Sequence, residues 1–575
     1  MKSFSMRTRI ILSVVVVGGL TSLFFTNCSS EGFATLNNDN LIGSSSLGNG
    51  DPLINYAWHL ENIAQKVFAS KSGTAGMDLD LLSTNAQGIS GAGVRVMISD
   101  DGVEDTHEDL YGNFLAGSFS KDYTTASPYT AATARPSHIS DNHGTAVAGI
   151  IAAMANNGVG ARGVAPGAKF ASSNFLSASV SQTVARMSDQ ATGDYDILNM
   201  SWGGSQNTLV LGDSTFESTL LSRVTNGRSG KGVVFIKSAG NDFRILCNGS
   251  GSTYCVGNSN FDGDNTNPFI MMTAASNAAG KVASYSSPGA NLWVTAPAGE
   301  FGYDTPAMVT TDRTGCDKGF AGTSVTTQVA FDKGSNGNSK CNYSVTFNGT
   351  SAAAPVVTGV VALLLEANPN LSWRDVRYIL AKTAVPLDYI TSGYVPHPLG
   401  TASPTNYAWD QVWVTNKAGF HFHNWYGFGQ VDVDAAVAMA KSYTSSFGTY
   451  QSTGWYDKAN LSLAVPDNSA TGVSSVMTVS STVKVEAVQL RIYIAHNDLS
   501  ELALELTSPS GTRSVVINMN NSLTGMKDYL GEVFLTNAFY QEVATGNWTL
   551  KVIDGKSGSN VGTLTRWSLN IWGAP

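Results

Sequence analysis

A serine enclosed by small residues is the first feature of this sequence that points to chemistry. Residues 348–355 read NGTSAAAP and precede the apolar run VVTGVVALLLEA. Small neighbours let a substrate backbone approach the Ser351 hydroxyl, and the N–H groups at the start of a following helix would face a developing negative charge. Ser351 is therefore a candidate nucleophile. The alternative interpretation is a helix N-cap, where serine and threonine are common.

Two further segments contain residues that would activate such a nucleophile. The apolar run RVMIS predicts a strand, and Asp100 follows it directly. Open α/β folds build their sites at the C-terminal edge of the sheet, where Asp100 would lie. His143 lies at the start of a predicted helix in DNHGTAVAGIIAAMA. Because a helix N-terminus disfavours an imidazolium, a general base there needs a carboxylate nearby, and Asp100 can supply it. The chain order Asp, His, Ser is one of the orders in which the Ser-His-Asp triad occurs.

The apolar pattern predicts the scaffold that must position these residues. Between about residues 51 and 440, apolar runs such as 93–99, 195–202 and 232–241 alternate with helical stretches. This alternation favours an α/β fold with a mainly parallel sheet and helices on both faces. After about residue 450, short alternating runs are separated by Gly-, Asn- and Ser-rich turns, a pattern typical of an all-β sandwich.

The composition is that of a globular chain with a large core. Of the 575 residues, 42% are hydrophobic and only 13% are charged, which is enough apolar material for two or three domains. The formal net charge is −9, so the balance of charge gives no sign of nucleic-acid binding.

The first 28 residues have the layout of a secretory signal, with basic residues, an apolar run and then Cys28. We expect Cys28 to be lipidated, as in bacterial lipoproteins, and to anchor the exported protein to a membrane of the bacterial envelope. Asn27 departs from the small residue usual at that place, and the alternatives are ordinary signal cleavage with secretion or an uncleaved anchor. Residues 29–50 are rich in Ser, Asn and Gly and predict a flexible tether.

Four cysteines remain if Cys28 is lipidated, an even number that suits two disulfides in an oxidising compartment. Sequence proximity favours Cys247 with Cys255 and Cys316 with Cys341. His421 and His423 would share one side of a strand, but without further ligands the pair is expected to be structural. His107 is expected on a surface loop.

Several segments resemble the subtilisin superfamily (peptidase S8), specifically its kexin and furin branch. They are VMISDDGVEDTHEDL, DNHGTAVAGIIAA, SAGN and FNGTSAAAPVVTGVVALLLEANPNLSWRDVRYIL. The resemblance covers roughly residues 51–574, with a catalytic domain over 51–445 and a P (Homo B) domain over 450–575. The P domain is expected to pack on the catalytic domain and stabilise it, and carbohydrate or protein binding is the alternative.

The resemblance implies a serine endopeptidase that hydrolyses peptide bonds in proteins or peptides. In that mechanism Ser351 attacks the scissile carbonyl, His143 transfers the proton, and Asp100 orients and stabilises the imidazolium. Asn241, in SAGN, matches the oxyanion-hole asparagine, although a turn-capping role is favoured from the residue alone. Other functions for the same fold are a non-catalytic envelope binding or scaffold protein, and an esterase or amidase.

The resemblance also implies a Ca²⁺ site. Its ligands would be the side chains of Asp51, Asp109 and Asn157 and backbone oxygens near Met154, Val159 and Ala161. These are hard oxygen donors, which calcium prefers. Without the resemblance, the NNGVG segment would be interpreted as a solvated turn.

The match is weaker in the residues expected to select the substrate. The expected substrate-binding positions are Asp101, Asp262, Ser201, Trp202 and Gly203. Gln206 stands where an acidic residue is expected, and Ser287 where a second calcium site would have a glutamate. We therefore expect relaxed selection for paired basic residues in the substrate, and the sequence does not predict a second calcium site. Asp262 can still anchor one basic side chain, or it can be a turn aspartate.

The family usually has a folded propeptide between the signal and the catalytic domain, but here only the tether at 29–50 lies between them. The chain is therefore expected to fold unaided or with the help of a separate chaperone or activator.

Overall fold

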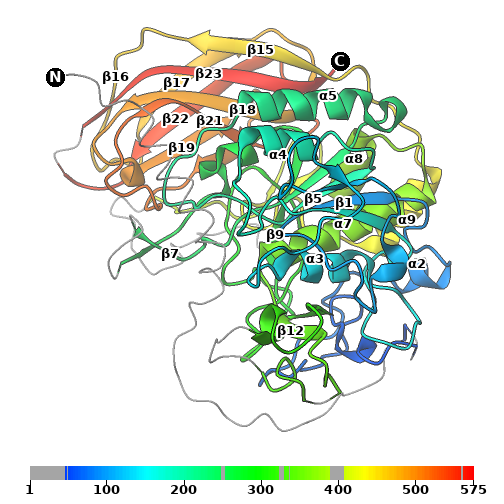
Figure 1. Ribbon diagram of the computed structural model, residues 1–575. Coiled ribbons are helices and arrows are strands. Elements are labelled where there is room, and N and C mark those ends of the chain that lie inside the picture. The colour runs from blue at the N-terminus through cyan, green and yellow to red at the C-terminus, as the bar shows by residue number, and fades with distance from the viewer. Residues whose placement is uncertain are drawn as a thin grey trace.

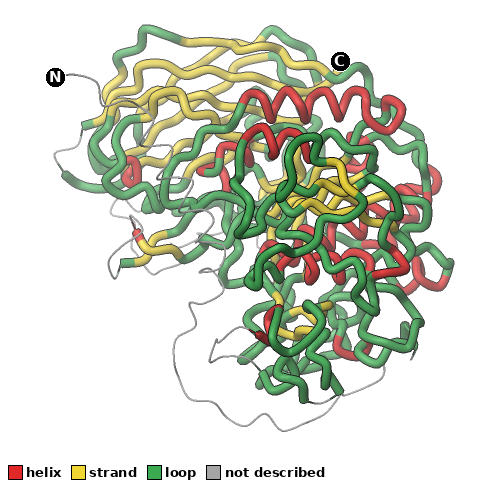
Figure 2. The backbone as a smooth tube through the Cα atoms, viewed as in Figure 1, coloured by secondary structure: helices red, strands yellow, loops and turns green. Residues whose placement is uncertain are grey.

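The computed structural model describes residues 46–47, 50–247, 253–322, 329–335, 337–388, 407–558 and 561–575. Cys28, the predicted signal and most of the predicted tether lie outside these residues. Figure 1 shows an α/β unit beside a layered unit of C-terminal strands, coloured from yellow through orange to red, and Figure 2 shows these strands in yellow.

The α/β unit is built on an eight-stranded sheet with the order β10-β9-β6-β5-β1-β4-β2-β3. The strands are β1 (Arg95–Ser99), β2 (Ser120–Lys121), β3 (Thr130–Ala131), β4 (Lys169–Ser173), β5 (Ile197–Met200), β6 (Val234–Ser238), β9 (Ile270–Ser276) and β10 (Leu292–Pro297). Neighbouring strands are parallel except β2 and β3, which confirms the predicted mainly parallel sheet. Strands β5, β6, β9 and β10 are buried along their whole length, as expected where helices cover both faces.

Helices lie on both faces of this sheet (Figure 1). The helices of this unit are α2 (Leu82–Ala86), α3 (His143–Ala152), α4 (Val184–Gln190), α5 (Ser214–Gly230), α6 (Gly319–Gly322), α7 (Thr350–Ala367), α8 (Trp373–Thr383) and α9 (Val433–Ser442). Helices α3 and α7 pack against each other, and α4 packs against α5. Helix α7 runs under β5, β6, β9 and β10, so its N-terminus is held rigidly beneath the sheet.

Helix α7 is apolar on nearly all sides because it is a core helix. In the described part of the chain it is the one helix long and apolar enough to span a membrane, and 89% of its apolar window is buried inside the protein.

The C-terminal unit is a sandwich of two antiparallel sheets. One sheet contains β15 (Gln451–Lys458), β16 (Leu463–Val465), β18 (Lys484–Ala495), β21 (Tyr529–Thr536) and β23 (Gly562–Ala574). The other contains β17 (Val473–Val479), β19 (Leu502–Thr507), β20 (Arg513–Ile517) and β22 (Gly546–Asp554). Their inner faces share a core that includes Leu490, Trp548 and Trp567. Alternate residues of β17 are exposed and buried, as in a sheet with one solvated face.

The two units share a buried interface. Arg374 of α8 forms an ion pair with Glu486 of β18, and both side chains are almost fully buried. The Trp572 ring of β23 lies 5.2 Å from the ring of Phe269 and stacks on Tyr450 at 5.5 Å. The expected packing of the C-terminal unit on the catalytic unit is thus confirmed.

Three two-stranded sheets complete the fold: β7 (Ile245–Leu246) with β8 (Tyr254–Cys255), β11 (Met308–Thr311) with β12 (Tyr343–Phe347), and β13 (Val414–Thr415) with β14 (His421–Phe422). The predicted disulfides Cys247–Cys255 and Cys316–Cys341 are both present, which confirms the pairing expected from sequence proximity.

Candidate active site

Parallel strands bring three of the candidate residues to the same edge of the sheet. Asp100 follows β1, Ser201 follows β5, and Asn241 lies three residues after the end of β6. Because the C-terminal ends of neighbouring parallel strands lie side by side, these residues converge although they are distant in sequence.

Asp100 and His143 form a pair in which Asp100 is fully buried and the His143 side chain is partly exposed. The His143 Nδ1 atom lies 2.9 Å from Oδ1 and 3.0 Å from Oδ2 of Asp100. Burial alone would lower the pKa of His143, but the charge and hydrogen bond of Asp100 outweigh it and raise the pKa. The carboxylate thus orients the ring and stabilises a proton on it, as a general base requires.

The start of α3 is shaped to hold this histidine against the sheet. A Cβ atom at Gly144 would lie 2.3 Å from the Gly102 oxygen and 2.9 Å from the Asp100 Cβ, so only glycine fits there. Asp101 accepts hydrogen bonds from the His143 N–H at 2.9 Å and the Gly144 N–H at 2.7 Å. A carboxylate at a helix N-terminus is favourable, and Asp101 therefore positions α3. Its expected contact with substrate stays a prediction.

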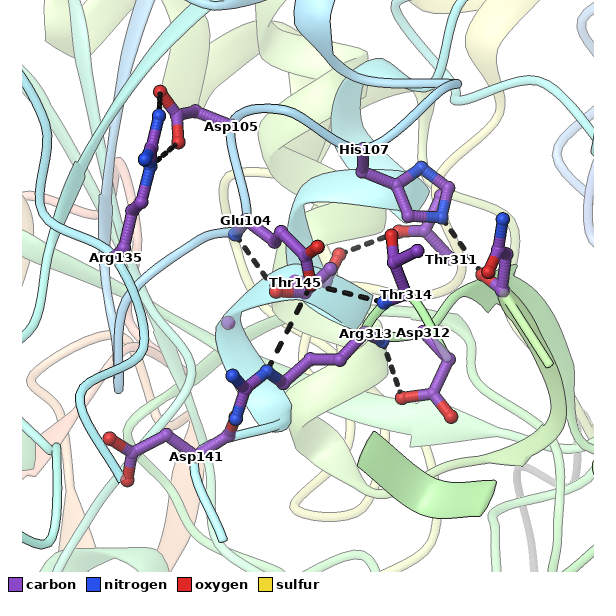
Figure 3. A network of polar contacts seen from close by, with 12 residues as sticks. Glu104, Asp105, His107, Arg135, Asp141, Thr145, Thr311, Asp312, Arg313 and Thr314 are labelled. Atoms are coloured by element: carbon purple, nitrogen blue, oxygen red, sulfur yellow. Dashed lines mark hydrogen bonds and ion pairs between the residues drawn. The ribbon is translucent and has the colours of Figure 1, made fainter. Parts of the chain in front are cut away.

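A polar network fixes α3 from its other side (Figure 3). Glu104 donates its N–H to Thr145 Oγ1 at 3.1 Å, and its carboxylate accepts the Thr314 N–H at 3.0 Å. Thr311 Oγ1 donates to the Thr145 oxygen at 2.7 Å. These bonds join the loop after β1 and the end of β11 to the helix that carries His143.

His107 belongs to the same region, and its predicted surface position is wrong. The side chain is fully buried, with Nε2 2.9 Å from the Asn342 oxygen. Its Nδ1 accepts the Asp109 N–H at 3.1 Å. Sequence alone did not reveal this burial because neighbouring acidic residues suggested an exposed loop. In the pair His421 and His423, His423 is buried in an aromatic cluster, consistent with the expected structural role.

Ser351 lies in the first turn of α7, beside the edge of β5. Its Oγ donates to the Ser201 oxygen at 3.1 Å, and Ser201 Oγ donates to the Ser351 oxygen at 3.0 Å. The His143 ring lies 5.2 Å from the ring of Phe347, which ends the strand leading into α7. The histidine and the serine therefore lie in the first turns of two packed helices, and the histidine ring contacts the end of the strand that leads to the serine.

Asn241 lies directly beside the backbone that precedes Ser351. Its Oδ1 accepts the Thr350 N–H at 2.8 Å and the Thr350 hydroxyl at 3.0 Å. Gly349 has φ +89°, and a Cβ there would lie 3.2 Å from Asn241 Nδ2. Since the amide oxygen is held by Thr350, the nitrogen is the atom that can donate to an oxyanion next to Ser351. A histidine paired with a buried aspartate, a hydroxyl at a helix start and an amide donor together make acyl-transfer chemistry possible.

Comparison with known proteins agrees with this geometry. Residues 91–429 match the subtilase family (Peptidase S8), and residues 485–571 match the proprotein convertase P-domain. The chain belongs to the subtilase family. It is a subtilisin-like serine protease that carries a P domain.

Relatives cover nearly the whole chain. The Aeromonas extracellular serine protease of Aeromonas sobria is 35% identical over 561 residues, covering 90% of this chain and 87% of that protein. Furin of Rattus norvegicus is 29% identical over 542 residues, covering 91% of this chain and 58% of furin. The solved structure of the serine protease of Aeromonas sobria has a TM-score of 0.83 at 31% identity, covering 94% of this chain and 100% of that one. Its complex with the chaperone ORF2 has a TM-score of 0.83 at 30% identity, covering 92% of this chain and 95% of that one.

The expected calcium ligands of this subtilase lie together at the far end of α3. Asn157 donates its N–H to Asp51 Oδ1 at 3.0 Å and its Nδ2 to Asp109 Oδ1 at 2.8 Å. The Asp109 carbonyl oxygen accepts the Met154 N–H at 2.9 Å, and the Val159 N–H donates to Asn157 Oδ1 at 3.1 Å. The backbone of Ala161 follows in the same loop.

The two carboxylates of this cluster fit a divalent cation. Asp51 and Asp109 are buried, and Asp109 Oδ2 has no hydrogen-bond partner among the described residues. Burial, with the charge of Asp51, raises the pKa of Asp109 to about 8. A hard cation would relieve this unfavourable burial of negative charge. The Asn157 amide presents its nitrogen to Asp109, so ligation through its oxygen would require the amide to turn over.

The subtilase's expected substrate-binding segment is Ser201–Gly203. Trp202 Nε1 donates to Ser99 Oγ at 2.9 Å, which anchors the segment to the sheet. Asp262 is buried behind it and accepts the Gly204 N–H at 2.9 Å. The structure therefore brings Asp262 against Gly203 and Gly204, in the segment whose first residue, Ser201, contacts Ser351.

Gln206 and Ser287, which stand where acidic residues were expected, form hydrogen bonds with neighbouring residues. Gln206 donates its N–H to Asp242 Oδ2 at 2.7 Å and its Nε2 to the Ala239 oxygen at 2.7 Å. Ser287 Oγ accepts the Asp242 N–H at 2.8 Å. The buried Gln206 side chain thus ties its loop to the end of β6, and the presence of a second calcium stays untested.

One residue of this site was missed by sequence reasoning. Lys237, in the fully buried strand β6, places its Nζ 3.0 Å from Asp262 Oδ2. A signal for it existed, because a lysine inside the apolar run VVFIKSAG must find a buried partner.

Proposed function

We propose that this subtilase is an endopeptidase in which Ser351 attacks the scissile peptide carbonyl. His143 takes the hydroxyl proton and returns it to the leaving amine, while Asp100 keeps the ring oriented and stabilises its charge. Asn241 Nδ2 and the Ser351 N–H stabilise the oxyanion. The observation that carries this proposal is the Asp100–His143 pair at the start of α3, which packs against the helix whose first turn contains Ser351.

Calcium has a structural role in this proposal. Asp51 and Asp109 would hold the ion, which supplies charge compensation to a loop at the end of α3 and takes no part in the chemistry. Support comes from the unpartnered, buried carboxylate oxygen of Asp109.

We further propose that the enzyme is exported and works outside the cytoplasm on other exported proteins. Two disulfides suit an oxidising compartment, and a relative is named an extracellular serine protease. The lipid anchor at Cys28 remains part of this proposal. A separate chaperone is supported by the relative whose structure was solved in complex with one.

The test is cleavage of a diverse peptide library by purified protein lacking residues 1–28, with calcium present. Cleavage is expected from the wild type and from a control variant, Ser222→Ala, which alters an exposed serine of α5. Ser351→Ala should lose cleavage by at least about 1,000-fold. Folded protein that leaves the whole library intact, with or without a coexpressed chaperone, would contradict the proposal and favour a binding or scaffold role.

A further inference from the structure

The edge of the sheet that carries the candidate catalytic residues also contains a lysine whose side chain is buried. Lys237 lies in β6, opposite Met200 of β5, and its side chain is fully buried. Met200 directly precedes Ser201, the hydrogen-bond partner of Ser351, and Asn241 lies four residues after Lys237. The lysine is therefore buried near the ends of the two strands that lead to Ser201 and Asn241.

The ammonium group is held by three neighbours. Its Nζ bonds to Asp262 Oδ2 at 3.0 Å and to Asn265 Oδ1, and it lies 5.2 Å from the ring centre of Trp202. Burying an ammonium group costs free energy unless the group is paired and hydrogen-bonded. These three contacts compensate the buried charge of Lys237.

Both carboxylate oxygens of Asp262 accept hydrogen bonds from the protein itself. Oδ2 accepts from Lys237 and from the Gly204 N–H, and Oδ1 accepts the Asp264 N–H at 3.1 Å. Burial alone would raise the pKa of Asp262, but the charge of Lys237 and these bonds lower it. The acid stays ionised, and its charge is balanced within the protein.

This ion pair lies against the backbone that would contact substrate. A Cβ atom at Gly203 would be 3.1 Å from Asp262 Oδ2 and 3.2 Å from Lys237 Nζ. A substrate side chain that entered beside Gly203 would therefore meet a neutral ion pair. A cationic side chain would have to displace Lys237 or place a second positive charge beside it.

We propose that Lys237 is a specificity-determining residue that takes the place of a cationic substrate side chain at Asp262. The enzyme therefore has no preference for Arg or Lys at the substrate position that faces Gly203, and it accepts uncharged side chains there. This inference rests on the proposed endopeptidase function and names the substrate class for the same site.

The experiment compares peptides that share one sequence and carry Lys, Arg, Gln or Met at each of the four positions before the scissile bond in turn. For the wild type, kcat/KM for Lys and for Met should agree within about tenfold at every position. Lys237→Met, which keeps the volume and removes the charge, should raise the Lys-to-Met ratio at one position by at least about tenfold. The double variant Lys237→Met/Asp262→Asn should cancel that rise, because no carboxylate remains to bind the cation.

Two results would overturn the inference. One is a wild-type preference for Lys or Arg above about tenfold that Asp262→Asn removes, since Asp262 would then be binding substrate in spite of Lys237. The other is a Lys-to-Met ratio that does not change in folded Lys237→Met. The wild-type and Asp262→Asn ratios decide the matter even if Lys237→Met fails to fold. If Lys237→Met cleaves peptides in a Ser351-dependent way but has the wild-type Lys-to-Met ratio, this inference alone is refuted. If the wild type shows no Ser351-dependent cleavage, the proposed function is refuted as well.

Discussion

Neutralising Glu486 should destabilise the protein severely, because it leaves a positive charge buried between the two units. The Arg374 and Glu486 side chains are 9% and 2% exposed, and two further contacts join Arg374 Nε to both carboxylate oxygens, at 2.9 Å to Oε2 and 3.2 Å to Oε1. In Glu486→Gln, Arg374 would keep the Gly448 oxygen at 2.6 Å and the rings of Phe447 and Tyr450. Breaking a buried pair in this way costs about 3–5 kcal/mol.

The assay is urea unfolding followed by tryptophan fluorescence, with an exposed ion pair as the matched control. Asp304→Asn removes the partner of Lys71 in a pair whose side chains are 66% and 67% exposed, and it should cost only about 0–1 kcal/mol. The double variant Arg374→Met/Glu486→Gln should be more stable than Glu486→Gln alone, since it removes the uncompensated charge. A midpoint for Glu486→Gln equal to that of Asp304→Asn would refute the reasoning that this buried pair joins the two units.

Three more outcomes follow from the site. Asn241→Ala should lower kcat by about 100 to 1,000-fold, the cost of removing one oxyanion donor in subtilisin, with little change in KM in steady-state assays; an equal rise in KM would indicate a binding role instead. The neutral ring of His143 is the active base and Asp100 raises its pKa, so kcat/KM should fall as pH drops through a midpoint above about 6.5. Asp100→Asn should move that midpoint down and lower kcat by about 10⁴, and an unchanged midpoint would contradict the assignment. Chelation should lower the thermal midpoint of the wild type but shift Asp109→Asn much less, as measured by calorimetry with and without calcium; equal shifts in both would place the ion elsewhere.

The sequence was informative where a local pattern determines the outcome. Apolar runs alternating with helical stretches predicted the parallel sheet because buried parallel strands must be apolar along their whole length. Asp100, His143 and Ser351 could be identified because each lies at a helix start or strand end with small neighbours that permit close approach. The disulfides followed from proximity along the chain.

Contacts between distant segments could not be read in the same way. Lys237 and Asp262 are separated by 25 residues, and only the parallel register of β5, β6 and β9 brings them together. Arg374 and Glu486 are 112 residues apart and meet across two domains. His107 was assigned to the surface because local polarity does not show which loop will be covered by the strand after Asn342.

The central claim is that Ser351 is a nucleophile activated by His143. A fluorophosphonate probe tests it directly, because the serine oxygen forms a bond to phosphorus as fluoride leaves and the proton passes to the base. Intact mass and peptide mapping should show one probe per molecule on Ser351 in calcium-loaded protein, none in Ser351→Ala, and labelling slowed by at least about 1,000-fold in His143→Ala. Folded wild-type protein that remains unlabelled, or carries the probe on another residue, would contradict the account.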